Sequence, residues 1–225
     1  KIEKKNIYSI LDFGENGFKG VKIETIGLVL NGKKTKDNQV KFYSYTNKNY
    51  ILQNQDYIID PKFPYWLLYR DKFFDDVCKK MEFGVFNFFR DRQITKKHTL
   101  NKGKIRVLKS RNISNNNIVS LDGYDTYLNE IDSFVVSKYL NKKNVYLVPN
   151  LTYYPRACKL PENSIVDGSA ALLFPKKDKK INNKQLEFFA SKEFTAFYRI
   201  ARNFGTRSLN IDKNSVFFWG LKKAN

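Results

Sequence analysis

The sequence predicts an α+β fold that is rich in strands and has two main helices. Short segments of β-branched and aromatic residues, separated by turn residues, recur along the 225 residues. Only two stretches show the three- and four-residue apolar spacing of an amphipathic helix. Hydrophobic residues make up 42% and aromatic residues 16%, which is enough for a packed core and excludes a disordered or low-complexity chain.

The first part of the chain, residues 7–45, is predicted to be β structure. Its strands are expected at Ile7–Phe13, Val21–Leu30 and Val40–Tyr45, where β-branched and aromatic residues are dense. Glycines separate the first two strands. Asn31-Gly32 is typical of a hairpin turn and predicts that the second strand turns back into the third.

A linker and a helix are predicted next. Residues 51–65 are polar, contain Pro61 and Pro64, and show no clear period. A helix is expected at about 66–82, with Gly84 as its C-cap. We therefore predict two parts, residues 1–60 and residues 61–225, with the boundary near residue 60.

The rest of the chain is predicted to form short strands and a second helix. The helix is expected at about 184–203, where Leu186, Phe189 and Phe194 lie on one face. The strands are expected at Val85–Phe89, Ile105–Leu108, Ser133–Ser137, Val145–Val148 and Ile165–Phe174.

The charge of the chain favours a polyanionic partner. Its 41 Lys and Arg exceed its 22 Asp and Glu by 19. Residues 1–60 hold 10 basic and 7 acidic side chains, whereas residues 61–225 hold 31 and 15 and contain all nine arginines. Arginine forms paired hydrogen bonds with phosphates and guanine edges, so nucleic acid is the first expectation and an anionic membrane surface the second.

The cysteine count and the absence of targeting patterns indicate a cellular compartment. Cys78 and Cys158 are too few for a disulfide framework and fit a reduced cytoplasm. The sequence shows neither a signal-peptide pattern nor an apolar run of the ~18 residues that a membrane span needs. Because the chain begins at Lys1, we expect it to be a piece of a longer polypeptide.

Catalytic patterns are scarce. The glycines of residues 14–20 precede an expected strand, whereas a phosphate-binding loop must precede a helix, so a nucleotide site is rejected. His98 has no second ligand at metal spacing and is expected to be a solvated loop residue. Cys158 lacks a neighbouring base and is expected to be a structural thiol, although Arg156 could lower its pKa.

The strongest binding signal is the basic stretch from Arg90 to Arg111, which carries nine basic residues and one acid, Asp91. A strand with one basic face here could neutralise phosphates, and arginines at its ends could contact base edges. The alternative is a solvated charged face. The candidate DNA-binding residues of this region are Arg90, Arg92, Lys96, Lys97, Lys109, Arg111 and Asn112.

Two further clusters are candidates for base contacts. Pro149–Arg156 offers tyrosine rings, an amide and a guanidinium, although paired tyrosines also pack in cores. The end of the second predicted helix carries three arginines and no acid. The candidates from these clusters are Asn150, Tyr153, Tyr154, Arg156, Arg202 and Arg207.

These segments, in this order, resemble the C-terminal part of bacterial adenine-specific DNA methyltransferases of restriction–modification systems. Residues 10–30, ILDFGENGFKGVKIETIGLVL, resemble the closing β-hairpin of their catalytic domain. Four further segments resemble a TaqI-like target-recognition domain: FFRDRQIT (88–95), IRVLKSRNI (105–113), residues 145–175 and residues 186–212. Type I specificity subunits share this plan.

The resemblance implies that residues 1–60 are the end of a methyltransferase sheet plus a linker, and that residues 61–225 choose the DNA sequence. The glycine-rich S-adenosylmethionine motif and the Asn-Pro-Pro-Tyr tetrad of that family are missing from this sequence. We therefore expect no cofactor and no catalytic residue in this chain, S-adenosylmethionine in the parent enzyme, and two partners: duplex DNA and the catalytic domain of the same polypeptide. A type I specificity subunit, a general nucleic-acid-binding module and a complete enzyme remain as alternatives.

Overall fold

The computed structural model describes residues 6–32, 38–150, 152–177, 179–205 and 210–223. The structure is a strand-rich α+β fold with two main helices, as the sequence predicts. Contacts divide the chain into two compact units, Lys1–Asp75 with Arg199–Arg207, and Asp76–Tyr198 with Ser208–Asn225. Residues 61–75, which composition assigns to the second part, belong to the first unit by their contacts.

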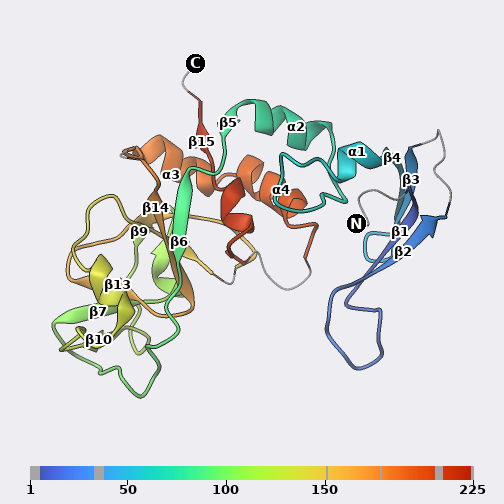
Figure 1. Cartoon of the computed structure of the whole chain (residues 1–225). Helices are drawn as coiled ribbons and strands as arrows, with labels where there is room; N and C mark the ends of the chain where they lie inside the picture. Colours follow the sequence, from blue (N-terminus) through green and yellow to red (C-terminus); the bar gives the residue numbers. More distant parts are fainter. Residues whose placement is uncertain (1–5, 33–37, 151, 178, 206–209, 224–225) are drawn as a thin grey trace. The chain divides into compact units, whose positions relative to one another are not determined.

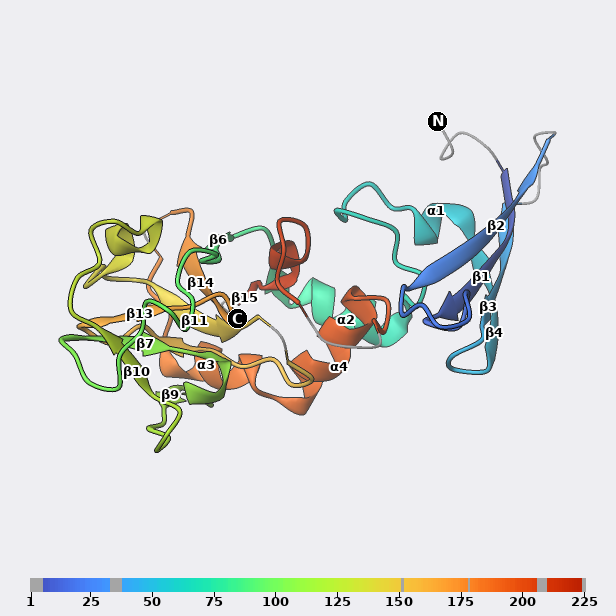
Figure 2. The same ribbon diagram turned by 90° about the horizontal axis from the view of Figure 1, so that it is seen from below.

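The first unit contains a four-stranded sheet of β1 (Asn6–Gly14), β2 (Thr25–Asn31), β3 (Gln39–Ser44) and β4 (Asn49–Asn54), in the order β2-β1-β3-β4 (Figure 2). β1 is antiparallel to β2 and parallel to β3. The predicted hairpin of β2 with β3 is therefore wrong. The fully buried Ile10 and Phe42 are paired across β1 and β3, so burial of this apolar pair outweighs the local turn signal of Asn31-Gly32.

The predicted linker at 51–65 is partly wrong, because it contains most of β4 and all of the short helix α1 (Gln55–Ile58). β4 pairs with β3 along its whole length. None of its side chains is fully buried, so this edge strand lacks the apolar alternation that identifies strands. The side chain of Asn54 caps α1 by accepting from Asp56 N at 2.8 Å.

The first predicted helix is shorter than expected. Helix α2 spans Lys72–Lys79, because Asp71 Oδ1 accepts a hydrogen bond from Phe74 N at 2.8 Å and so caps its start. The chain then forms β5 (Met81–Glu82), which pairs with β15 (Leu221–Lys222). Gly84 has a φ of +66° but donates to Phe217 O at 3.0 Å, so it is a loop residue and not a helix cap.

The second unit contains two larger sheets (Figure 1). In one, the order is β12-β11-β14-β6; in the other, it is β10-β7-β13. Their side chains share one core, in which Val107, Leu147 and Leu172 are fully buried. The strands are β6 (Phe86–Phe89), β7 (Ile105–Leu108), β10 (Thr126–Leu128), β11 (Tyr146–Pro149), β12 (Cys158–Lys159), β13 (Ser164–Val166) and β14 (Ala170–Pro175); β8 (Ile113–Ser114) and β9 (Asn117–Ile118) form a small ribbon.

Two predicted strands of this unit need correction. The segment 165–174 is two strands, β13 and β14, which lie in different sheets. Asp167 Oδ1 accepts from both the backbone N and the hydroxyl of Ser169, and this local turn breaks the apolar run. The segment 133–137 is not a strand, because Val135–Tyr139 forms the 3₁₀ helix η3 and buries only Val136 and Tyr139.

The second predicted helix is two helices, α3 (Asn183–Phe189) and α4 (Lys192–Ala201). The hydroxyl of Ser191 accepts from Phe194 N at 3.0 Å and starts the second of them. Phe189, Phe194 and Tyr198 pack around Trp219, which is 1% exposed and follows the 3₁₀ helix η4 (Ser215–Phe218). This aromatic cluster explains the helical spacing seen in the sequence.

Candidate nucleic-acid interface

The loop that follows β6 presents most of the candidate cations. Asp91, its one acid, is 1% exposed and accepts from the backbone N atoms of Gln93 at 3.0 Å and Ile94 at 2.7 Å. The acid therefore fixes the loop from inside while Arg92, Lys96 and Lys97 are exposed.

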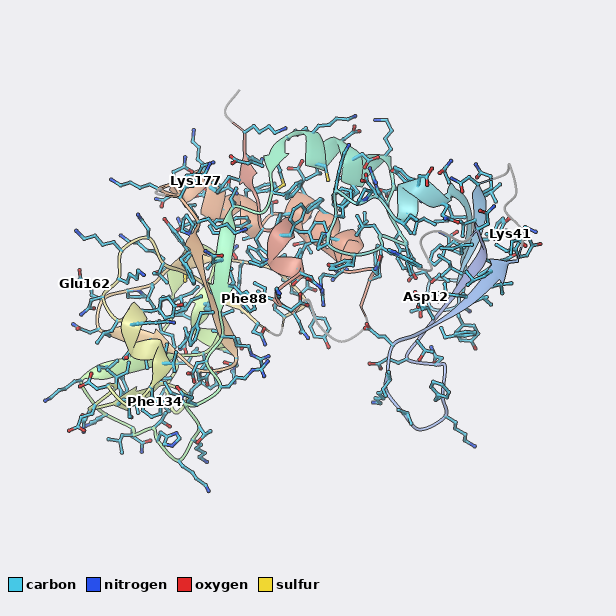
Figure 3. The ribbon with its side chains drawn as sticks, in the orientation of Figure 1. Asp12, Lys41, Phe88, Phe134, Glu162 and Lys177 are labelled. Atoms are coloured by element: carbon cyan, nitrogen blue, oxygen red, sulfur yellow. The ribbon has the colours of Figure 1, made fainter. Side chains whose placement is uncertain are left out.

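His98 lies in the same loop and is exposed, as expected. Its Nδ1 accepts from Thr95 N at 3.1 Å, and its ring lies 5.3 Å from that of Phe134, which is labelled in Figure 3. Its contacts are those of a loop residue.

A hollow of about 1140 Å³ continues the basic surface. Lys96, Lys102 and Lys109 contribute to its wall, together with Tyr124 and carboxylates that include Asp122. Lys109 Nζ donates to Tyr124 O at 2.9 Å and lies 4.7 Å from the centre of the Tyr124 ring. The wall is polar and carries both signs of charge, which suits hydrogen bonding more than apolar binding.

Tyr124 also connects the hollow to Arg111. The Arg111 guanidinium lies 4.9 Å from the centre of the Tyr124 ring, and the Arg111 side chain is exposed. Sequence reasoning missed Tyr124, although the preceding Asp122-Gly123 pair marks a turn and Gly123 has a φ of +67°. A tyrosine face shared by two cations holds both of them at one place on the surface.

Arg156 connects the loop that carries Tyr153 and Tyr154 to the turn that carries Arg111. Its Nη2 donates to Ser110 O at 3.0 Å and its Nε to Ile113 O at 2.6 Å. Its Nη1 donates to Tyr154 O and to the Thr152 hydroxyl, both at 3.1 Å. Burial lowers the pKa of this guanidinium, and its hydrogens are used by neutral oxygens, so Arg156 supports the surface from below.

The tyrosines of this loop are the exposed members of the cluster. Tyr153 is 61% and Tyr154 is 65% exposed, so neither is a core residue. The alternative of core packing is therefore wrong for both rings. Exposed aromatic faces held beside cations can stack on bases or contact sugar edges.

The two candidate asparagines are buried instead of exposed. Asn112 donates to Val119 O at 3.1 Å and to Asp125 Oδ1 at 2.6 Å, and its Oδ1 accepts from Lys109 N. Asn150, with its amide oxygen turned toward Arg90, accepts from that guanidinium at 3.1–3.3 Å and donates to Ile211 O at 3.2 Å. Both amides are 0% exposed, so they position neighbouring groups and cannot contact a base.

Arg90 and Arg92 differ in the same way. Arg90 is partly buried and donates through Nε to Gly168 O at 2.8 Å, whereas Arg92 is exposed. Both contribute to a hollow of about 470 Å³ that also includes Asn210 and Lys213. Arg92 is thus the arginine of the pair that is available to a ligand.

The third cluster, at the end of the second predicted helix, is assigned to the other unit. Arg202 belongs to the first unit, where its Nη1 lies 3.5 Å from Tyr65 Oη. Arg207 lies outside the described residues. The second unit therefore brings together one surface, here called the basic strip, which consists of Arg92, Lys96, Lys97, Lys102, Lys109, Arg111, Tyr124, Tyr153 and Tyr154.

The other predicted chemistry can be assigned from burial and topology. Cys158 is 1% exposed, as expected of a structural thiol. Burial raises the pKa of its thiol to about 12, although the nearby Arg156 acts to lower it. The glycine segment 14–20 is followed by β2, as predicted, and not by a helix. Among the described residues, no group of three or more His, Cys, Asp or Glu side chains could hold a metal ion.

Within the part of the chain that the structure describes, no helix has the length and apolarity to cross a membrane. The sequence matches no protein-family model and no curated protein.

Proposed function

We propose that this chain recognises a specific sequence in duplex DNA, as the target-recognition domain of an N6-adenine DNA methyltransferase of a restriction–modification system. The observation that carries the proposal is the basic strip, which places exposed cations and two exposed tyrosines in one compact unit. Shared contacts connect four of its members, Lys109, Arg111, Tyr124 and Tyr154. Phosphate contacts give affinity and orientation, and contacts to base edges give specificity.

The strip contains groups for both tasks. Lys96, Lys97 and Lys102 are exposed, flexible point charges of the kind that neutralise phosphates. Arg92 and Arg111 carry planar guanidinium groups on loops whose backbones are fixed by internal hydrogen bonds. Such a group can donate two hydrogen bonds to a guanine edge. We assign base contacts to these two arginines and to Tyr153 and Tyr154.

The proposed partner in the same polypeptide is the catalytic domain. Support comes from the first unit, where Tyr8, Val29, Tyr43, Tyr45, Tyr50 and Leu52 are 43–66% exposed. An apolar hollow on this sheet is lined by Leu11, Phe13 and Tyr43, among others. Clustered exposed apolar groups mark interaction surfaces. In the proposal the catalytic domain binds S-adenosylmethionine and methylates the adenine, and this chain selects the site.

Binding of the 225-residue chain to duplex DNA tests the proposal. A selection from randomised duplexes should enrich a short motif that contains an adenine. Affinity for a labelled duplex, measured by fluorescence anisotropy, should fall by about two to four orders of magnitude between ~50 and ~200 mM NaCl, because several phosphates are neutralised. Affinity that stays flat across this range would contradict DNA binding, and salt-dependent binding without an enriched motif would favour a general nucleic-acid-binding module.

A further inference from the structure

The first unit contains a hollow of about 510 Å³ that the proposed DNA contacts do not use. Its wall includes the aromatic rings of Tyr65, Trp66, Tyr69 and Phe204 and the carboxylates of Asp12 and Glu24. Small-molecule sites have volumes of roughly 300–1,000 Å³ and combine apolar walls with a few fixed polar groups. The size and composition of this hollow meet both conditions.

The charged side chains in the described lining of the hollow are of opposite sign to the net charge of the chain. The sequence has 41 basic and 22 acidic residues, yet the charged side chains in the described lining are two carboxylates. Asp12, labelled in Figure 3, is partly buried in β1. Its Oδ1 accepts from Gly14 N at 2.9 Å and its Oδ2 accepts from the Tyr69 hydroxyl. Because both donors are neutral, the negative charge of Asp12 is left to attract a cation.

The aromatic walls are fixed before any ligand arrives. The amide of Asn203 donates to Trp66 O at 2.9 Å and accepts from Leu68 N at 2.8 Å. The ring of Phe204 lies 5.0 Å from that of Tyr69, whose hydroxyl is also 2.6 Å from the Ser44 hydroxyl. A wall held by such contacts loses little conformational entropy when a ligand binds.

The backbone at this wall is strained. Asn203 and Phe204 have φ values of +49° and +53°, a left-handed conformation that costs energy in residues other than glycine. Two consecutive residues of this kind place Phe204 at the hollow. Strained backbone persists where the surrounding structure holds it, and it is concentrated at binding sites.

We propose that this hollow binds an alkylated organic cation, an ammonium or a guanidinium, with Asp12 as the counter-ion and the aromatic rings as its walls. Aromatic faces attract cations, and the attraction grows when the cation is partly desolvated. A phosphate-bearing ligand is disfavoured by the carboxylate of Asp12. The cation can be a free small molecule or the side chain of a peptide, and both present the same chemistry to the hollow.

Intrinsic tryptophan fluorescence of the full chain tests the proposal, because Trp66 lines the hollow whereas Trp219 is 1% exposed in the other unit. The probes are tetramethylammonium, ethylguanidinium and the tripeptide Gly-Arg-Gly, each compared with NaCl at equal ionic strength. We expect saturable quenching by at least one of them, and preference for the tripeptide would identify a peptide as the source. Adenosine, which is uncharged, serves as a comparison. Quenching by all three cations that equals that of NaCl, or saturable quenching by adenosine and by none of the cations, would overturn the proposal.

Variants separate binding in the hollow from binding elsewhere. Asp12→Asn preserves an acceptor for Gly14 N and removes the charge, and it should weaken cation binding at least tenfold. Glu15→Gln removes an acid outside the described lining and should change it less than twofold. Trp66→Phe should abolish the quenching that the ligand causes, while calorimetry still detects binding. Circular dichroism checks that Asp12→Asn is folded, and a folded Asp12→Asn chain with wild-type affinity would contradict the assignment.

Discussion

Burial decides the chemistry of the two cysteines at the scale of single residues. Cys158 is 1% exposed with a pKa raised to about 12, whereas Cys78 is only partly buried. A pKa raised to about 12 leaves a thiolate fraction on the order of 10⁻⁴–10⁻⁵ near pH 7.5. We therefore expect N-ethylmaleimide to modify Cys78 before Cys158 in the native chain, as followed by mass spectrometry. In urea both thiols should react at similar rates, and equal rates in the native chain would contradict the burial of Cys158.

Arg156 provides the second prediction at this scale. Its guanidinium joins two loops through four hydrogen bonds, so Arg156→Met should destabilise the chain by about 2–4 kcal/mol in urea unfolding, since carbonyl groups lose charged donors. Arg156→Lys should recover only part of this loss, because an ammonium cannot span the same acceptors. Lys97→Ala, a change of an exposed cation, should leave stability within about 0.5 kcal/mol. Equal stability of all three variants would mean that Arg156 does not fasten the loops.

The sequence identified residue types of the site better than their roles. Arg156 and Asn150 were expected to contact bases because guanidinium and amide groups match base edges. Their partners include backbone carbonyls and another candidate, Arg90, from distant parts of the chain. The position of a carbonyl depends on tertiary structure, so neither spacing nor charge could reveal these contacts. Exposure of Arg92 was predictable, because polar loop segments lie on surfaces, whereas paired tyrosines also pack in cores and the sequence left Tyr153 and Tyr154 open.

At the scale of elements, strands with a buried apolar run were predicted most closely. The bounds of β7, Ile105–Leu108, agree with the prediction; β6 begins one residue later than predicted, and β11 is shifted by one residue at both ends. The failures occur where a local side chain interrupts a continuous pattern: Asp71 at α2, Asp167 between β13 and β14, and Ser191 between α3 and α4. Apolar periodicity continues through each of these positions, so it could not show the breaks.

The helix caps offer a test at this scale. Asn182 accepts from Gln185 N at 2.9 Å at the start of α3, and Ser191 accepts from Phe194 N at the start of α4. Asn182→Ala and Ser191→Ala should each reduce the free energy of unfolding by about 1 kcal/mol, because a backbone N–H loses its partner. Lys184→Ala, an exposed change within α3, should have almost no effect. If the cap variants match Lys184→Ala in chemical denaturation, the caps do not determine where the helices begin.

At the scale of the whole molecule, charge indicates the class of partner, and topology determines which charges act together. The sequence offers three clusters of candidate DNA-binding residues. The structure keeps Arg90–Arg111 and Pro149–Arg156 in one unit and assigns Arg202 to the other. The start of α4 belongs to the second unit and its end, from Arg199, to the first. This division could not be predicted, because the apolar spacing of a helix does not show which core each turn contacts.

The proposed division of labour within the basic strip leads to a prediction for the chain as a whole. Arg92 and Lys97 lie in one loop and are both exposed, so each can be removed with little effect on the fold. Arg92→Ala should cost about 1–3 kcal/mol on the selected duplex and relax preference at one base pair, because a two-pronged donor to a base edge is lost. Lys97→Ala should weaken binding to every sequence alike and lower the salt slope by about one unit, because one phosphate contact is lost.

Competition anisotropy with the selected duplex and its single-base variants distinguishes the two effects. Lys143→Ala, which removes an exposed cation outside the basic strip, controls for the change in net charge. If Arg92→Ala and Lys97→Ala reduce affinity equally for every sequence, Arg92 contacts phosphate. Base recognition would then have to be sought at Arg111 and the two exposed tyrosines. Arg111 is the stronger alternative, because the Tyr124 ring and the turn fastened by Arg156 already hold its guanidinium in place.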